Sequence, residues 1–350
     1  MGRALDLAEQ LGDIGTLFEV GELTLASRQG VEAQRVLLRL TEWFSKQSHE
    51  GVGARALAQV LWGSGSVLLG EGDRDRAESL WRDLSLLAAR TQDSTVALIA
   101  LRPAMALAAL DGRLEEAMDL GERCMERGEE LGSPVNARVI RTSQAFYPAL
   151  HTGHFRDGLN QATGLDEANG SSDGVHQVMK QALCFIHLGE DPPSRSLIAG
   201  VLEGLRLSQR QEAEATPVNV LIFLIQAAVL LRDIEVCRLC TEPLRQVAAM
   251  ITPYGSTVVA RHLGTAYALL GEPDKARIYY HQAIEVCTKI GFRPELALTR
   301  LELAELLLDH YPAERAEAIG HLDFAIRECR DMKMARSLDR ALRRREALGA

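Results

Sequence analysis

A glycine followed by small or apolar residues at fixed offsets recurs about every 40 residues, and this repeat most constrains the fold. In its clearest copy, Gly271 is followed after 5, 9 and 12 residues by Ala276, Tyr280 and Ala283. The same spacing follows four further glycines and one arginine that takes the glycine's place: Gly72, Gly112, Gly153, Gly189 and Arg232. Repeats of this length predict stacked helix pairs, because one pair alone cannot bury its apolar face.

The residues at these offsets are small or apolar in most of the further copies. They are Ala77, Trp81 and Leu84; Ala117, Gly121 and Cys124; Gly158, Ala162 and Leu165; Ser194, Ile198 and Val201; and Cys237, Thr241 and Leu244. With small shifts of phase, Ala33, Leu37 and Leu40 indicate a first copy, and Ala318, Leu322 and Ala325 a last one. Small residues let antiparallel helices approach closely, and glycine suits a left-handed helix cap. We expect one all-α domain over residues 1–350, a right-handed superhelical α-solenoid of about eight antiparallel helix pairs.

Composition supports an all-helical chain with reduced thiols. Aromatic residues make up only 5% of the sequence, and runs of alternating β-branched residues, which favour strands, are absent. The six cysteines are scattered, as in reduced intracellular proteins, and predict buried thiols. Cys237 and Cys240 lie within one predicted helix, and no second Cys or His pair follows at zinc-finger spacing. We therefore expect neither a metal site nor a cofactor.

The charge of the chain argues against nucleic acid and membrane as direct partners. The formal net charge is -9, whereas phosphate binding draws on clustered lysine and arginine. The basic C-terminal stretch that contains Arg336, Arg340 and Arg343–Arg345 is interpreted as a helix C-terminus that favours cations. DNA contact by this stretch is the alternative. No apolar run reaches the ~18 residues of a membrane span, and Met1–Gln10 does not resemble a signal peptide. These features predict a soluble, cytoplasmic protein.

Sequence motifs for catalysis are absent. The glycines at 63, 65, 70 and 72 lack the lysine of a phosphate-binding loop. No zinc-protease motif or nucleophile elbow occurs either. We therefore expect no catalytic residues and no enzymatic activity.

A binding role is expected on the concave side of the superhelix, which the first helices of the pairs line. The repeat phase places seven residues toward this channel: Trp62, Arg102, Tyr147, Met179, Gln226, Arg261 and Thr265. The arginines would bind a carboxylate or an acidic peptide, and Trp62 and Tyr147 would supply anchor area. The alternative is that all seven are partly exposed helix residues without a ligand. Pro103 and Pro148 follow two of them and predict kinks, or late helix starts, that widen the groove. The alternative is that Pro103 lies in the first turn of its helix, where proline is tolerated.

Two family resemblances add to this picture. Leu263-Gly264, Tyr267, Gly271, Ala276, Tyr280 and Ala283 resemble the pattern of a tetratricopeptide repeat (TPR), although the repeat here is longer. Gly291–Ala297, Leu301–Leu308, Ala325 and Met332, with the opening Ala4–Asp13, look like the C-terminal repeat regions of bacterial LuxR-type ATP-binding regulators and of class III adenylate cyclases fused to an ATPase. No Walker motif, cyclase domain or C-terminal DNA-binding helix-turn-helix accompanies them. The resemblance implies a sensor arm whose ATPase, cyclase or DNA-binding domain is missing or separate.

Two functions follow from these observations. The chain is expected to be a non-catalytic interaction module that binds a partner protein or peptide in its groove, within a bacterial signalling or transcription-regulating ATPase system. The alternative is a sensor arm that binds a small-molecule effector and controls a partner ATPase or cyclase.

Overall fold

The computed structural model describes residues 13–27, 34–163, 173–210, 216–252 and 256–348, and the regular structure in these ranges is helical. The helices are α2 (Ile14–Ser27), α3 (Gln34–Phe44), α4 (Ala54–Gly70), α5 (Arg74–Arg90), α6 (Ser94–Ile99), α7 (Arg102–Leu110), α8 (Leu114–Glu130), α9 (Pro134–Gln144), α10 (Phe146–Thr152), α11 (Phe155–Thr163), α12 (Asp173–Leu188), α13 (Asp191–Arg210), α14 (Val218–Leu231), α15 (Ile234–Leu244), α16 (Val259–Leu269), α17 (Pro273–Ile290), α18 (Arg293–His310), α19 (Arg315–Asp331) and α20 (Ala335–Glu346). No strand occurs within these ranges, and Ile251 and Val258 form an isolated β-bridge. The all-α prediction is confirmed.

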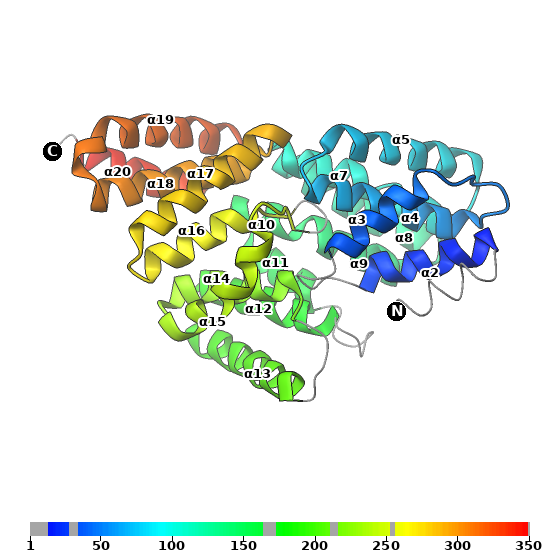
Figure 1. Ribbon diagram of the computed structural model, residues 1–350, viewed down its shortest axis with the longest axis horizontal. Helices are drawn as coiled ribbons and strands as arrows, with labels where there is room; N and C mark the ends of the chain where they lie inside the picture. Colours follow the sequence, from blue (N-terminus) through cyan, green and yellow to red (C-terminus); the bar gives the residue numbers. More distant parts are fainter. Residues whose placement is uncertain (1–12, 28–33, 164–172, 211–215, 253–255, 349–350) are drawn as a thin grey trace.

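Consecutive helices pack against each other as pairs, as Figure 1 shows along the whole coloured chain. The pairs are α2–α3, α4–α5, α6/α7–α8, α9/α10–α11, α12–α13, α14–α15, α16–α17 and α18–α19, with α20 following as a single helix. The described ranges therefore contain the eight pairs that the repeat predicts. Three parts of the predicted sequence pattern, Ala4–Gly12, Ala33 and Leu165, lie outside the described residues.

The turn inside six of the pairs uses a left-handed residue, as the repeat phase predicts. Gly72, Gly112, Gly153, Gly189 and Gly271 have φ between 75° and 89°. Arg232, which replaces the glycine in the α14–α15 turn, also has a positive φ of 56°. The backbone requirement of this turn therefore persists where the glycine does not.

The residues at offsets 5, 9 and 12 form the contact between the two helices of a pair. Every one of them that the structure describes is buried, from Ala77 in α5 to Ala283 in α17. Close approach is achieved by glycine in the first helix. A Cβ at Gly264 would lie 2.6 Å from the Cδ1 of Tyr280, and one at Gly65 would lie 2.2 Å from the indole nitrogen of Trp81. These two glycines make room for the large side chain of the second helix.

Two first helices are interrupted next to a proline. The helix of the third pair ends at Ile99 and resumes as α7, with Pro103 in its first turn. That of the fourth pair ends at Gln144 and resumes as α10, which contains Pro148. Interruption is expected because proline lacks the N–H that would continue the helix. Widening of a groove by these breaks stays a prediction.

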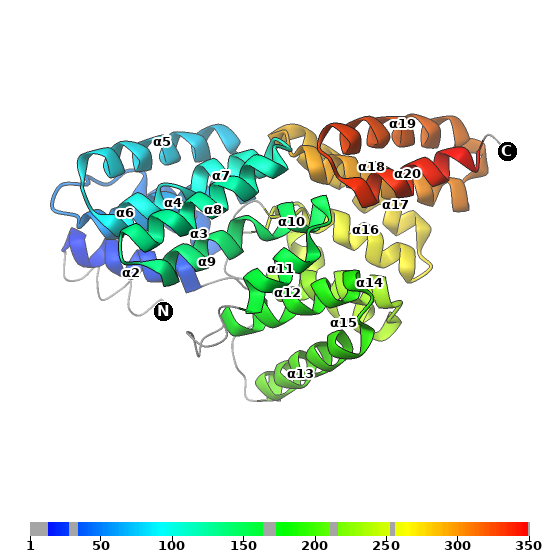
Figure 2. The ribbon, with the colours of Figure 1, turned by 180° about the vertical axis from the view of Figure 1, so that it is seen from behind.

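The pairs do not extend in one line, because the C-terminal pairs return toward the N-terminal ones. Figures 1 and 2 show the pairs up to α9 on one side, α16–α20 on the other, and α11–α15 below and between them. Arg74 donates to the carbonyl of Ile290 at 2.9 Å, and Arg293 donates to the carbonyl of Asp111 at 3.2 Å. Lys333 forms an ion pair with Glu115. We call these bonds between the two ends the seam.

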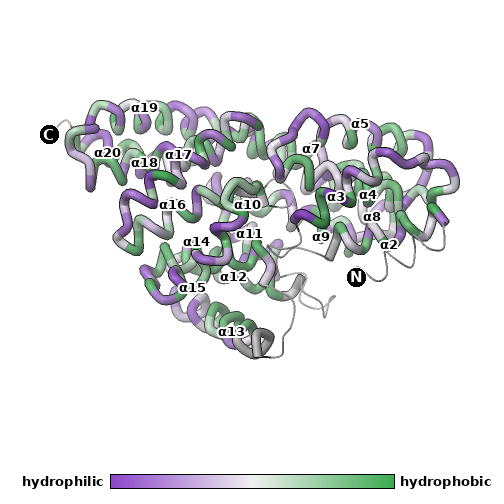
Figure 3. Tube along the Cα trace, in the orientation of Figure 1, coloured by the Kyte–Doolittle hydropathy of each residue, from purple (hydrophilic) through white to green (hydrophobic). Residues whose placement is uncertain are grey.

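Apolar burial is distributed along the chain rather than concentrated in one core. Green hydrophobic residues alternate with purple hydrophilic ones in every pair of Figure 3. The six cysteines are all buried free thiols, as predicted. No described helix has both the length and the apolar character that crossing a membrane requires.

Candidate functional site

Four of the seven predicted groove residues are buried instead of facing an open channel. Trp62, Met179, Tyr147 and Arg261 expose 2%, 0%, 9% and 7% of their surface. The prediction that these four line an accessible groove is wrong, because neighbouring helices fill the inner side of the superhelix. Their predicted role in binding is not supported by their positions.

The other three, Arg102, Gln226 and Thr265, are partly buried and serve internal contacts. The Arg102 guanidinium lies 5.5 Å from the centre of the Trp62 ring, which itself stacks on Trp81. Gln226 donates a hydrogen bond of 2.9 Å to the hydroxyl of Tyr147. The structure thus brings Arg102 to Trp62, Gln226 to Tyr147 and Thr265 to Arg261. Met179 lies in the same hydrophobic cluster as Tyr147. Ligand binding by Arg102, Gln226 and Thr265 stays a prediction.

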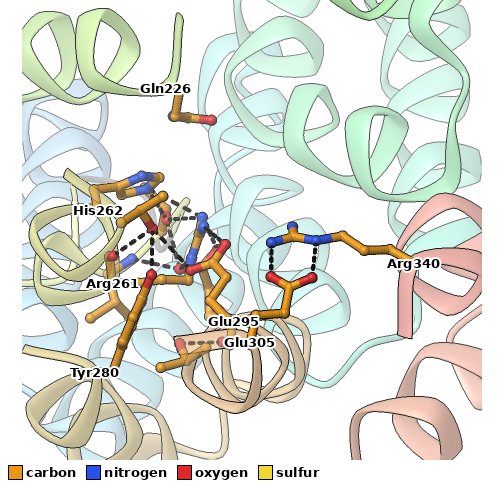
Figure 4. A network of polar contacts seen from close by, with 12 residues as sticks. Gln226, Arg261, His262, Tyr280, Glu295, Glu305 and Arg340 are labelled. Atoms are coloured by element: carbon orange, nitrogen blue, oxygen red, sulfur yellow. Dashed lines mark hydrogen bonds and ion pairs between the residues drawn. The ribbon is translucent and has the colours of Figure 1, made fainter. Parts of the chain in front are cut away.

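Arg261 lies at the centre of a buried polar network between α16 and α18 (Figure 4). Its guanidinium donates to both carboxylate oxygens of Glu295, with Nε–Oε2 at 2.8 Å and Nη2–Oε1 at 3.0 Å. It also donates to Glu302 at 3.1 Å, and Thr265 donates to the second oxygen of Glu302 at 3.0 Å. The hydroxyl of Thr257 and the backbone N–H of Val258 complete the shell of Glu295.

The two carboxylates of this network have opposite electrostatics. Burial disfavours the charge of Glu295, but Arg261 outweighs it and lowers the pKa of that carboxyl to about 2. Burial dominates at Glu302 and raises its pKa, although Arg261, Arg340 and the hydrogen bond from Thr265 favour its charged form. His262 is buried in the same network, and its pKa is lowered well below the usual value by burial and by Arg261. The network is thus a charged, enclosed link between two repeats.

An open cleft lies elsewhere, where α20 returns over the turns α12–α13 and α14–α15. Its volume is about 560 Å³. It is lined by Ile186, His187, Asp191, Arg195, Leu230, Leu231, Arg232, Arg336, Ser337, Arg340 and Arg343. Five of these eleven side chains are arginines, and three are aliphatic. We call this the arginine cleft.

Two of the five arginines are already engaged. Arg340 donates to both carboxylate oxygens of Glu305 (Figure 4), and the Nε–Oε1 distance is 2.8 Å. Arg336 donates to Nδ1 of His187 at 2.7 Å and lies 4.8 Å from the centre of the Phe155 ring. Burial and the charge of Arg336 lower the pKa of His187 to about 4, so its ring is neutral and accepts this bond at pH 7. These contacts fix α20 as one wall of the cleft.

The other three arginines, Arg195, Arg232 and Arg343, are exposed and have no ion-pair partner among the described residues. They come from three separate elements: α13, the α14–α15 turn and α20. The one acidic side chain that lines the cleft with them is Asp191. The cleft is therefore strongly positive on a chain of net charge -9.

Two features of the sequence bear on this cleft, and both also have a purely structural interpretation. Arg232 replaces a turn glycine of the repeat, and the C-terminal arginines are predicted to lie at a helix C-terminus. Arg343–Arg345 do lie in the last turn of α20, where Arg344 and Arg345 also pair with Asp309 and Asp323 on α18 and α19. Arg336, in the first turn of α20, and Arg343 line the cleft. Its formation depends on α20 reaching α12 and α14, which lie far from it in the sequence.

Comparison with known proteins leaves the family of the chain open. No protein-family model and no curated protein matches it. Among solved structures, a human IFIT1 dimer with PPP-AAAA is similar at 13% sequence identity and a TM-score of 0.48, covering 90% of this chain and 72% of that chain. The helix pairs and their left-handed turns, described above, make this chain a TPR-like helical solenoid.

Proposed function

We propose that this chain is a non-catalytic interaction module that binds an acidic peptide segment of a partner protein in the arginine cleft. The observation that carries the proposal is the convergence of Arg195, Arg232 and Arg343 without ion-pair partners among the described residues. Arginine donates pairs of parallel hydrogen bonds to carboxylates, which gives both affinity and orientation. An unengaged group of such donors is available to a ligand.

The cleft also offers apolar contacts, which favour a peptide over a bare anion. Leu230 is 46% exposed at its edge, and Leu231 and Ile186 line it. Ile234, which follows Leu231 by three residues and lies at the start of α15, is 39% exposed. A leucine-sized side chain of the partner would cover these surfaces and remove them from water. We therefore propose a segment in which acidic residues flank an aliphatic one.

The lining of the cleft also favours peptide over nucleic acid. Single-stranded nucleic acids bind through bases stacked on aromatic side chains together with a basic track along the backbone. The one aromatic ring among the residues that line the arginine cleft is that of His187, and it is already stacked on Phe155. The chain as a whole carries excess negative charge, which repels a long polyanion. A compact acidic segment avoids this repulsion.

The groups in the cleft do not support catalysis. Ser337, His187 and Asp191 line it together, but no hydrogen bond joins any two of them in the described structure. The Nδ1 of His187 accepts from Arg336, which would hold its basicity low. A serine nucleophile needs a base that is free to take its proton. We therefore propose a binding function without chemistry.

A small anionic effector is the second candidate. The cleft volume of about 560 Å³ falls within the range of ~300–1,000 Å³ that small-molecule sites occupy. A thermal-shift screen with anionic metabolites separates this candidate from the first. An effector at 100 times its Kd raises the free energy of unfolding by about 2.7 kcal/mol.

We further propose that the module acts in the cytoplasm as the sensor arm of a bacterial signalling or transcription-regulating ATPase system. The support is the sequence similarity of Gly291–Ala297 and Leu301–Leu308 to the repeat regions of such regulators. Gly291–Ala297 form the α17–α18 turn, at the seam, and the start of α18, and Leu301–Leu308 lie in the second half of that helix. A nucleotide-binding domain encoded next to this chain would support the assignment, and its consistent absence among close relatives would contradict it.

Fluorescence anisotropy with a labelled peptide of glutamates flanking a leucine tests the proposed function. The double variant Arg195→Gln/Arg343→Gln should bind at least tenfold more weakly than the unmodified chain. Arg82→Gln, an exposed arginine on the outer side of α5, is the matched control and should bind normally. A peptide with lysines in place of the glutamates should not bind. Equal binding of both peptides would refute the proposal.

A further inference from the structure

We infer that Arg195, Arg232 and Arg343 form a subsite for a phosphate group, carried by a phosphorylated residue of the partner peptide. This inference rests on the proposed function, because it assigns the ligand chemistry of the same cleft. Three observations carry it. The backbone of Arg232 is left-handed, three arginines of the cleft have no ion-pair partner among the described residues, and the neighbouring Arg336 and Arg340 are held by other side chains.

Arg232 has a left-handed backbone conformation, with φ 56° and ψ 38°. The corresponding turn residue of five other pairs is glycine, which adopts this conformation without steric cost. A residue with a Cβ is strained there, and such strain concentrates at functional sites. At this turn the side chain that replaces glycine is a guanidinium that lines the cleft.

Lys333 provides a comparison for Arg232, because it too has a left-handed backbone. It is the other described non-glycine residue with positive φ, at 57°, and it caps the turn before α20. Lys333 pairs with Glu115 across the seam, so its side chain has an evident structural partner. Arg232 has none among the described residues. A contact with a ligand would fill that role.

The charge of the subsite matches a dianion. Arg195, Arg232 and Arg343 share the cleft with one carboxylate, that of Asp191, and these four groups sum to two positive charges. Arg336 adds a third, because its partner His187 is neutral, whereas Arg340 is neutralised by Glu305. A phosphorylated side chain carries about -1.5 to -2 charges and three acceptor oxygens at neutral pH. A glutamate carries one charge and two oxygens, so it would leave part of this excess unmatched. Phosphate therefore fits three forked donors better than carboxylate does.

Arg336 and Arg340 frame the subsite without belonging to it. Arg340 is held by Glu305, and Arg336 is held between His187 and Phe155. Their partners lie on α18, α12 and α11, so they fix α20, which carries Arg343, relative to the middle repeats. The two engaged arginines thus hold α20 in place as a wall of the cleft. The other three arginines face the ligand.

Three fluorescent peptides of identical sequence, with phosphoserine, glutamate or serine at one position beside a leucine, test the inference. The unmodified chain should bind the phosphoserine peptide at least tenfold more tightly than the glutamate peptide. Arg232→Gly should abolish this preference while circular dichroism and thermal midpoint show a folded chain. Arg82→Gln should retain the preference.

The outcomes separate the two proposals. If the glutamate peptide binds but phosphoserine gives no gain, or if Arg232→Gly keeps the gain, the phosphate subsite is refuted and the proposed function stands. If none of the peptides binds, the proposed function fails as well. Tighter binding of a single-stranded oligonucleotide with a terminal phosphate than of the phosphopeptide would overturn the assignment to a peptide.

Discussion

Arg261 and Glu295 are joined by two parallel hydrogen bonds, of 2.8 and 3.0 Å, in a place where the carboxylate is fully buried. The pair connects α16 to α18 and therefore one repeat to the next. The carboxylate also accepts hydrogen bonds from the hydroxyl of Thr257 and from the backbone N–H of Val258, so these bonds compensate for its burial. Removing the charge of Glu295 would leave the buried guanidinium with Glu302 alone.

Glu295→Gln should therefore be strongly destabilising. Breaking one side of a buried ion pair costs about 3–5 kcal/mol, because the remaining charge loses its compensation. Glu302→Gln is the matched comparison and should cost clearly less, since burial already raises the pKa of Glu302 and disfavours its charge. Urea titration followed by circular dichroism measures both. Equal losses for the two variants would contradict the roles assigned to these carboxylates.

Stability should fall in acid through Glu295. Its pKa is about 2 in the folded chain against an ordinary value of 4.5, so the unfolded chain takes up the proton first. The stabilisation is complete above about pH 4.5 and is lost as pH falls toward 2. Glu302 has a raised pKa and opposes this trend. Thermal midpoints from pH 6 to pH 2 should fall less steeply for Glu295→Gln than for the unmodified chain.

Arg232→Gly should stabilise the chain even though it weakens ligand binding. Glycine relieves a left-handed conformation that costs a residue with a Cβ about 1 kcal/mol. Arg232→Ala separates strain from charge, since alanine keeps the Cβ, and it should bring no gain. Lys333→Gly should gain less than Arg232→Gly because it loses the ion pair with Glu115. A thermal midpoint for Arg232→Gly at or below that of Arg232→Ala would argue against strain at this turn.

Gly264→Ala should destabilise the seventh pair, α16–α17. The added Cβ would lie 2.6 Å from the ring of Tyr280, which is itself buried and cannot move away. Overpacking of this kind costs about 1–3 kcal/mol. Gly204→Ala in α13 is the control, because nothing lies within 4 Å of its Cβ position. That exposed helical site should gain up to about 1 kcal/mol. The two free energies of unfolding should change in opposite directions.

The sequence was sufficient to predict contacts within a pair. The spacing of Gly271, Ala276, Tyr280 and Ala283 depends on two adjacent helices, and the turn glycines adopt the φ that their position requires. Such contacts are local, so a periodic pattern records them. Arg232 shows that the pattern holds even where the glycine is replaced.

The path of the solenoid could not be predicted in the same way. The offsets of Trp62 and Arg261 predict that they face an open channel, but the neighbours that bury them depend on how each pair is rotated against the next. Arg102 from the following pair lies over Trp62, and Arg261 meets Glu295 and Glu302 from the following pair. The repeat spacing predicts which face of a helix packs within its pair. It does not predict how successive pairs are rotated against each other or how the stack curves. The arginine cleft was missed for the same reason, because α20 forms it only by returning to the middle repeats.

The seam has a further consequence for how the molecule melts. Arg74 and Ile290 are 216 residues apart, and Lys333 and Glu115 are 218 apart. In a linear array the outermost unit can fray while its neighbours persist. Here detachment of either end deprives the other of its partners, which favours one all-or-none transition over gradual unravelling from the tips. The same closure makes the number of units difficult to change, because an inserted or deleted pair would pull Arg74 out of register with Ile290.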